Sequence, residues 1–240
     1  KQNPLYEKEG FAYFDTHYYG GIKKYQWTAI PLSLHGRVAR KDGTMVDICL
    51  GEKEDDPIFV ITDLLIHLAG EQMGKKATEV VTGENLDLLI GNIPLEKDSD
   101  TSKEEKETIK ANVLKLLADQ YGIDEEDFQS AELEIVPAGK ARDCGFDRSM
   151  VLSYGQDDRI CAFTSLFAML DAKCGTRTQC CLLVDKEEIG SVGATGMESR
   201  FFENTVAEVM ALTGQTSELL LRRALRNSKV LSSDVSAAYD

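Results

Sequence analysis

After a predicted strand at AELEIVPA (131–138), short apolar runs alternate with longer segments whose apolar residues recur at helical spacing, and this alternation limits the fold more than any other feature. The spacing predicts helices at about 157–171, 202–212 and 217–226. The apolar runs predict strands at QCCLLVD (179–185) and KVLSSDV (229–235). Strands that alternate with helices are typical of an α/β sheet covered by helices.

The sequence before this region has a different pattern. Residues 25–60 are rich in alternating and β-branched residues separated by turn signals, which favours a small β-rich unit. Thr62 as an N-cap and Gly70 near the end predict a short helix between them. A charged stretch at 96–107 predicts a surface loop, and a helix is expected from about 103 to 121, ending at Gly122.

Composition narrows the range of partners. The formal net charge is −14 and there is no clustering of Lys and Arg, so no nucleic-acid partner is expected. No apolar run approaches the roughly 20 residues that span a bilayer, so no membrane partner is expected either. The six cysteines lack the spacing of a disulfide framework, which favours reduced thiols and a cytoplasmic protein.

Three acidic features fall where an α/β sheet usually binds its ligands, beyond the carboxyl ends of strands. Glu187 and Glu188 follow QCCLLVD, Asp234 follows KVLSS, and Asp157 and Asp158 precede a predicted helix. A solvated turn is the simplest alternative for the Glu pair, and helix capping is the alternative for the Asp pair. If the three features converge, their like charges repel one another unless a divalent cation neutralises them.

An adjacent Glu-Glu pair beside a metal can divide the chemistry. One side chain can bind the metal while its neighbour accepts a proton from metal-bound water, as carboxylate bases do in zinc hydrolases. The glycines at 190, 193 and 196 are then expected to let the backbone approach the metals, since no Lys-Ser/Thr follows them as in a phosphate-binding loop.

Four segments in order, YYGGIKKYQW (18–27), GQDDR (155–159), DKEEIGS (185–191) and SSDV (232–235), resemble the aspartyl aminopeptidase and aminopeptidase-one family of zinc metallopeptidases. The residues of GGIKKYQW and DKEEIGS are more similar to the bacterial aminopeptidase-one branch than to animal aspartyl aminopeptidases. The resemblance implies an α/β/α metallopeptidase sheet domain, incomplete here, with an inserted mixed β-rich dimerisation domain. Residues 1–11 would start the peptidase domain, 12–131 would form the insertion, and 132–240 would carry the acidic ligands.

The resemblance also implies a role for each acidic residue. Asp157 would bridge two zinc ions with support from Asp158, and Asp234 would bind one of the two. Glu187 would be the general base and Glu188 a zinc ligand. His67, in ITDLLIHL (61–68), would reach from a neighbouring subunit towards the substrate carbonyl. Without the family, His67 reads as a histidine on the apolar face of a short helix.

The implied activity is removal of single N-terminal residues from peptides by metal-activated water, with two Zn²⁺ per subunit or other divalent metals in their place. The implied self-association runs from a dimer to a tetrahedral dodecamer. The family also supplies one histidine to each zinc, and neither His17 nor His35 suits that role. The chain is therefore expected to be an internal portion of the enzyme, inactive alone because both histidine ligands are missing.

Two alternatives stay open. A non-catalytic assembly or scaffold homologue would keep the fold and bind no metal. A related deblocking aminopeptidase would share the acids but lack the GGIKKYQW segment. The sequence leaves open whether acidic or neutral N-terminal residues are preferred.

Overall fold

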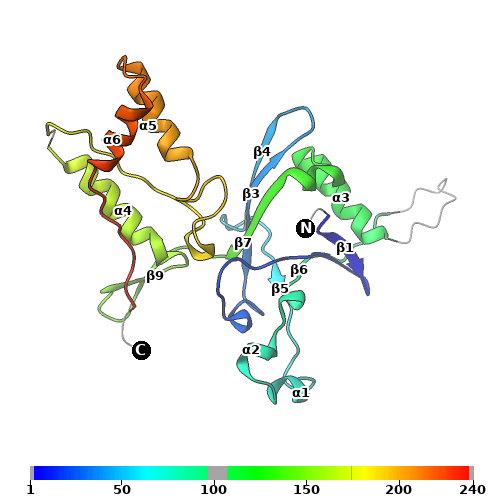
Figure 1. Ribbon diagram of the computed structural model, residues 1–240. Helices are drawn as coiled ribbons and strands as arrows, with labels where there is room; N and C mark the ends of the chain where they lie inside the picture. Colours follow the sequence, from blue (N-terminus) through cyan, green and yellow to red (C-terminus); the bar gives the residue numbers. More distant parts are fainter. Residues whose placement is uncertain (1–2, 97–106, 174, 238–240) are drawn as a thin grey trace. The chain divides into compact units, whose positions relative to one another are not determined.

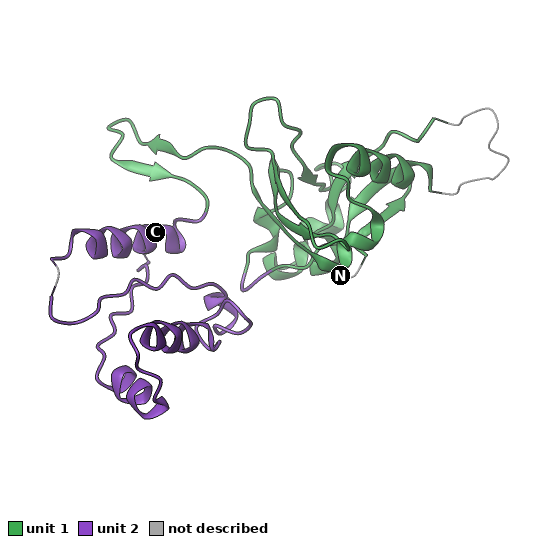
Figure 2. Cartoon of the chain, turned by 90° about the horizontal axis from the view of Figure 1, so that it is seen from above, with its two compact units in different colours: residues 1–18, 22–154 green, residues 19–21, 155–240 purple. Residues whose placement is uncertain are grey.

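The computed structural model describes residues 3–96, 107–173 and 175–237, which form two compact units (Figures 1 and 2). Unit 1 comprises residues 1–18 and 22–154, and unit 2 comprises residues 19–21 and 155–240. No helix in the described ranges is long and apolar enough to cross a membrane. These compact units are not the same as the expected domains. The boundaries expected between residues 11 and 12 and between residues 131 and 132 stay a prediction.

Unit 1 contains a four-stranded antiparallel sheet in the order β1-β2-β6-β5 (Figure 1). Its strands are β1 (Leu5–Lys8), β2 (Phe11–Phe14), β5 (Val60–Ile61) and β6 (Leu88–Gly91). The turn between β1 and β2 needs positive φ at both central residues, Glu9 (51°) and Gly10 (83°), which suits a two-residue hairpin connection.

A second antiparallel sheet in unit 1 has the order β4-β3-β7. It consists of β3 (Leu32–Ala39), β4 (Met45–Leu50) and β7 (Ala131–Pro137), which confirms the strand predicted at 131–138. Gly36 has φ of 147°, and a Cβ there would lie 2.0 Å from the carbonyl oxygen of Glu132, so only glycine fits between these strands. The β-rich character expected of residues 25–60 is confirmed.

Helices and short turns complete unit 1, and the helix at Thr108–Tyr121 packs against β1, β2 and β6. The helices are α1 (Gly70–Met73), α2 (Ala77–Val80) and α3 (Thr108–Tyr121), and the 3-10 turns are η1 (Lys24–Gln26), η2 (Gly83–Asn85) and η3 (Glu125–Ser130). Glu7 of β1 accepts hydrogen bonds from the backbone N–H groups of Ile109 and Lys110, at 2.9 and 3.0 Å, and so satisfies the free donors at the start of α3. The helix ends at Gly122 with φ of 61°, as predicted, while residues 103–106 of the expected helix lie outside the described residues.

The buried apolar core of the described residues lies in unit 1. Leu32, Val38 and Leu88 are fully buried, and the rings of Phe14 and Phe128 meet edge to face with centroids 5.5 Å apart. A hairpin of β8 (Arg142–Cys144) and β9 (Met150–Leu152) ends the unit. The five described cysteines are free thiols, and Cys174 lies outside the described residues.

Unit 2 consists of α4 (Gln156–Asp171), the turn η4 (Glu187–Ile189), α5 (Phe201–Leu212) and α6 (Glu218–Arg226), so the three helices predicted there are confirmed. The strands predicted at 179–185 and 229–235 are wrong for the described residues, because neither segment pairs with a strand in any of the sheets. A strand needs a neighbour to pair its N–H and C=O groups. The mixed α/β class is confirmed, but the sheet expected beneath these helices is not formed here.

Candidate metal centre

Three carboxylates of unit 2 come together from two separate segments. One oxygen atom from each of Asp157, Asp158 and Asp234 lies within 4.8 Å of the others, and all three side chains are exposed. Asp157 and Asp158 stand at the start of α4, whereas Asp234 lies in the extended segment after α6. Two of the three predicted acidic features therefore converge.

The backbone at the start of α4 is irregular. Gly155, with φ of 75°, is the N-cap residue, and Asp157 and Asp158 have non-helical dihedral angles inside the first turn. The peptide bond between the two aspartates is cis. The alternative that these residues are simple helix caps does not describe this arrangement, because the capping position belongs to Gly155.

Cys161 joins the two acidic segments and was not predicted from the sequence. Its thiol forms side-chain hydrogen bonds with Asp158 and with Ser233, the residue directly before Asp234. Partial desolvation, followed by the hydrogen bond to Asp158, raises the pKa of this thiol. The one sequence signal was its spacing, since residues i and i+3 share a helix face and Cys161 is three residues beyond Asp158.

Glu187 and Glu188 lie exposed in η4, inside a loop that is hydrogen-bonded to itself. The N–H of Ser191 donates to the carbonyl of Lys186 at 2.7 Å, and the N–H of Asp185 donates to the carbonyl of Thr195 at 3.2 Å. Among the described residues the three-carboxylate group does not include Glu188. The assignment of Glu188 as a ligand and Glu187 as a base stays a prediction.

The glycines after this pair serve the loop in two ways. Gly190 and Gly193 have φ of 87° and 85° with open space where a side chain would point, so they permit the turns. A Cβ at Gly196 would lie 2.0 Å from the carbonyl oxygen of Ser191. The close approach at Gly196 is therefore to the backbone of the same loop.

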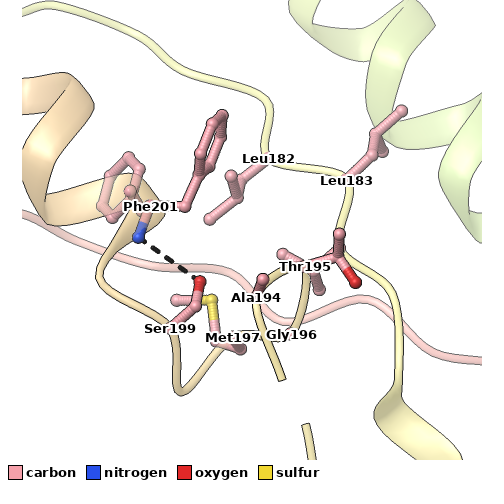
Figure 3. A pocket seen from close by; sticks show the side chains of 10 residues that line it. Leu182, Leu183, Ala194, Thr195, Gly196, Met197, Ser199 and Phe201 are labelled. Carbon is pink, nitrogen blue, oxygen red and sulfur yellow. Dashed lines mark hydrogen bonds between the residues drawn. The ribbon is translucent and has the colours of Figure 1, made fainter. Parts of the chain in front are cut away.

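A pocket of about 170 Å³ lies where the two ends of this loop meet (Figure 3). The lining residues include Leu182, Leu183, Thr195, Met197 and Phe201, all of which are labelled in Figure 3. The N–H of Phe201 donates to Ser199 Oγ at 3.3 Å, which fixes the start of α5 beside the pocket. The lining is mostly apolar and is continuous in sequence with the segment that carries the Glu pair.

His67 lies in unit 1 on an exposed loop, and the short helix predicted at 62–70 is wrong. Asp63 accepts hydrogen bonds from Gln72 Nε2 (2.8 Å) and Thr28 Oγ1 (3.1 Å), so its side chain holds the loop instead of lying in the first turn of a helix. The hydrogen bond from Gln72 holds the pKa of the Asp63 carboxyl below its usual range. Leu64, Leu65, Ile66 and Leu68 around the histidine are all more than half exposed.

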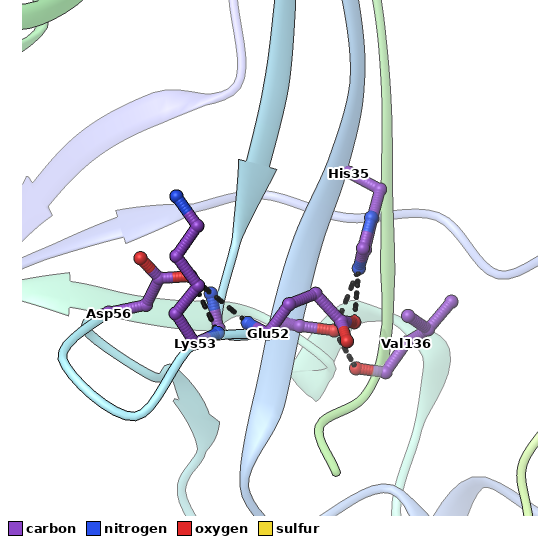
Figure 4. A network of polar contacts seen from close by, with 7 residues as sticks. His35, Glu52, Lys53, Asp56 and Val136 are labelled. Atoms are coloured by element: carbon purple, nitrogen blue, oxygen red, sulfur yellow. Dashed lines mark hydrogen bonds and ion pairs between the residues drawn. The ribbon is translucent and has the colours of Figure 1, made fainter. Parts of the chain in front are cut away.

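The other two histidines also belong to unit 1. His35 lies on β3, where its Nε2 contacts Glu52 Oε1 at 2.9 Å and Ser33 Oγ at 3.1 Å (Figure 4). In the same figure, Asp56 accepts backbone hydrogen bonds from Glu52 and Lys53, so the network fixes the turn after β4. His17 is exposed beside Tyr18, with ring centroids 6.4 Å apart.

Comparison with known proteins identifies the family of this chain. A sequence model of the family described as Aminopeptidase I zinc metalloprotease (M18) matches residues 1–240. A probable M18 family aminopeptidase 1 from Clostridium acetobutylicum is 62% identical over 240 residues, which are 100% of this chain and 50% of that protein. The chain thus spans about half the length of the curated relatives it matches.

Solved structures agree with this match. The crystal structure of aminopeptidase I from Clostridium acetobutylicum has a TM-score of 0.87 and 59% identity, covering 100% of this chain and 50% of that one. The mApe1 dodecamer of S. cerevisiae has a TM-score of 0.66 at 19% identity over 100% of this chain and 52% of its own, a likeness of fold alone.

Proposed function

The chain belongs to the aminopeptidase I zinc metalloprotease family (M18), and from this premise we propose that the full-length protein removes single N-terminal residues from peptides. One observation of the structure carries the proposal: Asp157, Asp158 and Asp234 place three carboxylate oxygens within 4.8 Å of one another. Isolated like charges would separate in water, so their convergence favours a cation between them.

The donor set fits a divalent metal. Carboxylate oxygens bind zinc at about 2.0–2.2 Å, and they bind manganese or magnesium as well. Asp157, with support from Asp158, would bind both ions, and Asp234 and Glu188 would each bind one. All four side chains are exposed, so a metal ion from solvent can reach them.

When bound, zinc polarises a substrate carbonyl and lowers the pKa of coordinated water to about 7. Glu187 accepts the proton of the attacking water and delivers it to the leaving amine, which is the role of a general acid-base group. Glu188 follows it directly in η4, so one short turn carries both the base and a ligand. The apolar pocket of about 170 Å³ beside that loop suits the side chain of an uncharged N-terminal residue.

We further propose that His67 acts in a neighbouring subunit, where it donates a hydrogen bond to the developing oxyanion. Its exposed loop supports this role, since Leu64, Leu65, Ile66 and Leu68 present an apolar surface that self-association would cover. Assembly would run from a dimer to a dodecamer, the state in which the S. cerevisiae relative was solved. A cytoplasmic location stays a prediction.

Residues 1–240 by themselves are proposed to be inactive. The acidic group of Asp157, Asp158 and Asp234 offers zinc only oxygen donors. Zinc prefers sites that include nitrogen or sulfur ligands, so this set should hold it weakly.

Turnover of a panel of aminoacyl substrates by the full-length protein tests the proposed function. Hydrolysis is expected to cease after treatment with a chelator and to return when zinc is added. The panel also decides between acidic and neutral N-terminal residues. Absence of turnover on every member, in protein that has been loaded with zinc, would contradict the aminopeptidase assignment.

A further inference from the structure

The turn at Tyr19–Gly21 belongs to unit 2, although the residues on either side of it, Tyr18 and Ile22, belong to unit 1. The turn lies within the segment YYGGIKKYQW (18–27), and no residue of this segment has a role in the proposed reaction. Within unit 2 this turn contacts the residues on both sides of Glu187.

Gly20 lies against Glu188. A Cβ at Gly20 would stand 3.0 Å from Glu188 Cβ, which is closer than two carbon atoms normally pack. Gly20 also has φ of 63°, a conformation that side chains disfavour. Glycine at this position therefore lets the turn close onto the base of the Glu188 side chain.

Tyr19 lies against Lys186. The Lys186 ammonium stands 5.6 Å from the centroid of the Tyr19 ring, within the range of a cation–π interaction, and 3.0 Å from Asp185 Oδ2. Lys186 has φ of 67°, which is unfavourable for a residue with a side chain and persists only where neighbouring groups hold it. The Tyr19 ring and the Asp185 carboxylate are two such groups.

We propose that Tyr19 and Gly20 are positioning residues that hold the Lys186–Glu188 turn in place and thereby set the direction of the Glu188 carboxylate. This inference rests on the proposed role of Glu188 as a metal ligand. The turn touches no substrate atom in this account. The turn acts on the metal site by orienting the Glu188 side chain. Outer-shell groups in metal centres act in the same way on the ligands that they contact.

Gly20→Ala in the full-length protein is the first test, with zinc affinity measured by calorimetry. We expect a loss of about 10–100-fold, the range for outer-shell substitutions. Two glycines serve as controls. Gly10→Ala introduces a side chain at positive φ (83°) with no atom within 4 Å, and Gly21→Ala introduces one in open space directly beside Gly20. Neither control should change zinc affinity.

A double-substitution cycle tests the Tyr19 contact. Tyr19→Leu and Lys186→Met should each weaken zinc binding by about two- to fivefold, the size of an exposed cation–π contact. The combined variant should be no weaker than either single one, because both remove the same contact. Tyr19→Phe keeps the ring and should bind zinc as the native protein does.

Amide hydrogen exchange gives a readout that does not depend on metal. The N–H groups of Gly190 and Ser191 donate to the carbonyls of Glu187 and Lys186 at 2.9 and 2.7 Å, so loosening this turn should speed their exchange in Tyr19→Leu. Faster exchange there with unchanged zinc affinity in Glu188→Gln would support the positioning role and reject the ligand role of Glu188. Native exchange rates in Tyr19→Leu together with control-like zinc affinity in Gly20→Ala would overturn the inference.

Discussion

Carboxylate oxygens of Asp157 and Asp234 lie within 4.8 Å of each other, although one residue begins the first helix of unit 2 and the other follows the last. This proximity brings the first turn of α4 close to the segment after α6. Because both groups are acidic, a bound cation would turn a repulsive contact into a stabilising one. The predictions below concern the full-length protein.

Asp234→Asn is expected to weaken zinc binding by more than the 10–100-fold that is typical of losing an outer-shell partner, because it removes a charged ligand. Calorimetric titration of the metal-free protein measures this loss. Asp171→Asn, an exposed change at the far end of α4, is the matched control and should bind zinc normally. Equal affinities in the two variants would contradict the ligand assignment.

Glu187→Gln and Glu188→Gln should affect different properties of the enzyme, namely its turnover and its zinc content. Loss of the base is expected to lower kcat by about 10²–10⁴-fold while zinc content stays native. Loss of the ligand should lower zinc content itself. Both side chains are exposed and close in size to glutamine, so neither change should alter the fold. Zinc loss in Glu187→Gln with retention in Glu188→Gln would reverse the two roles.

His67 acting between subunits predicts complementation. His67→Ala and Glu187→Gln should each be nearly inactive, yet mixed oligomers from co-expression of the two should regain activity, because some sites then combine intact residues from different subunits. Differently tagged chains allow the mixed oligomers to be isolated and assayed. Activity in His67→Ala alone, or none in any mixture, would contradict a role in trans.

Tyr6 predicts a pH effect on unit 1. Burial and the hydrogen bond from Tyr6 Oη to Asp87 Oδ2 (2.6 Å) raise the pKa of this phenol. A raised folded pKa contributes stability that is fully present below the ordinary value of about 10 and is lost as pH rises through the folded value. Tyr6→Phe should lower the free energy of unfolding by about 1 kcal/mol at pH 7.

Urea denaturation at pH 7 and pH 11 measures this difference. The gap between the native protein and Tyr6→Phe should shrink at the higher pH, because only the native protein loses that contribution. A gap that stays constant between the two pH values would show that the Tyr6 phenol is not perturbed.

Local sequence signals predicted α3, α4, α5 and α6, but they missed the short helices α1 and α2 and the features that depend on distant partners. Gly122 ended α3 as expected, and the helices of unit 2 begin and end within a residue of the predicted limits. The helix expected at 62–70 failed because Asp63 bonds Thr28 and Gln72, residues outside its own turn. QCCLLVD and KVLSSDV failed as strands because apolar composition specifies an extended chain but not its partner.

In the candidate site, too, some features could be predicted from the sequence and others could not. Convergence of Asp157 with Asp234 could be predicted from where each lies relative to its helix or apolar run. The links that organise the site could not: the Cys161 thiol bonds both Asp158 and Ser233, and Gly20 packs against Glu188 from far upstream. Such contacts depend on tertiary packing, which spacing along the chain does not encode.

Metal content of the full-length protein, purified without chelators, tests the account most directly. Elemental analysis is expected to find about two divalent ions per subunit, and fewer in Asp157→Asn, because this residue is assigned to both ions. A native protein that holds no divalent metal, even after incubation with zinc, would contradict the account and favour a scaffold homologue without catalytic chemistry.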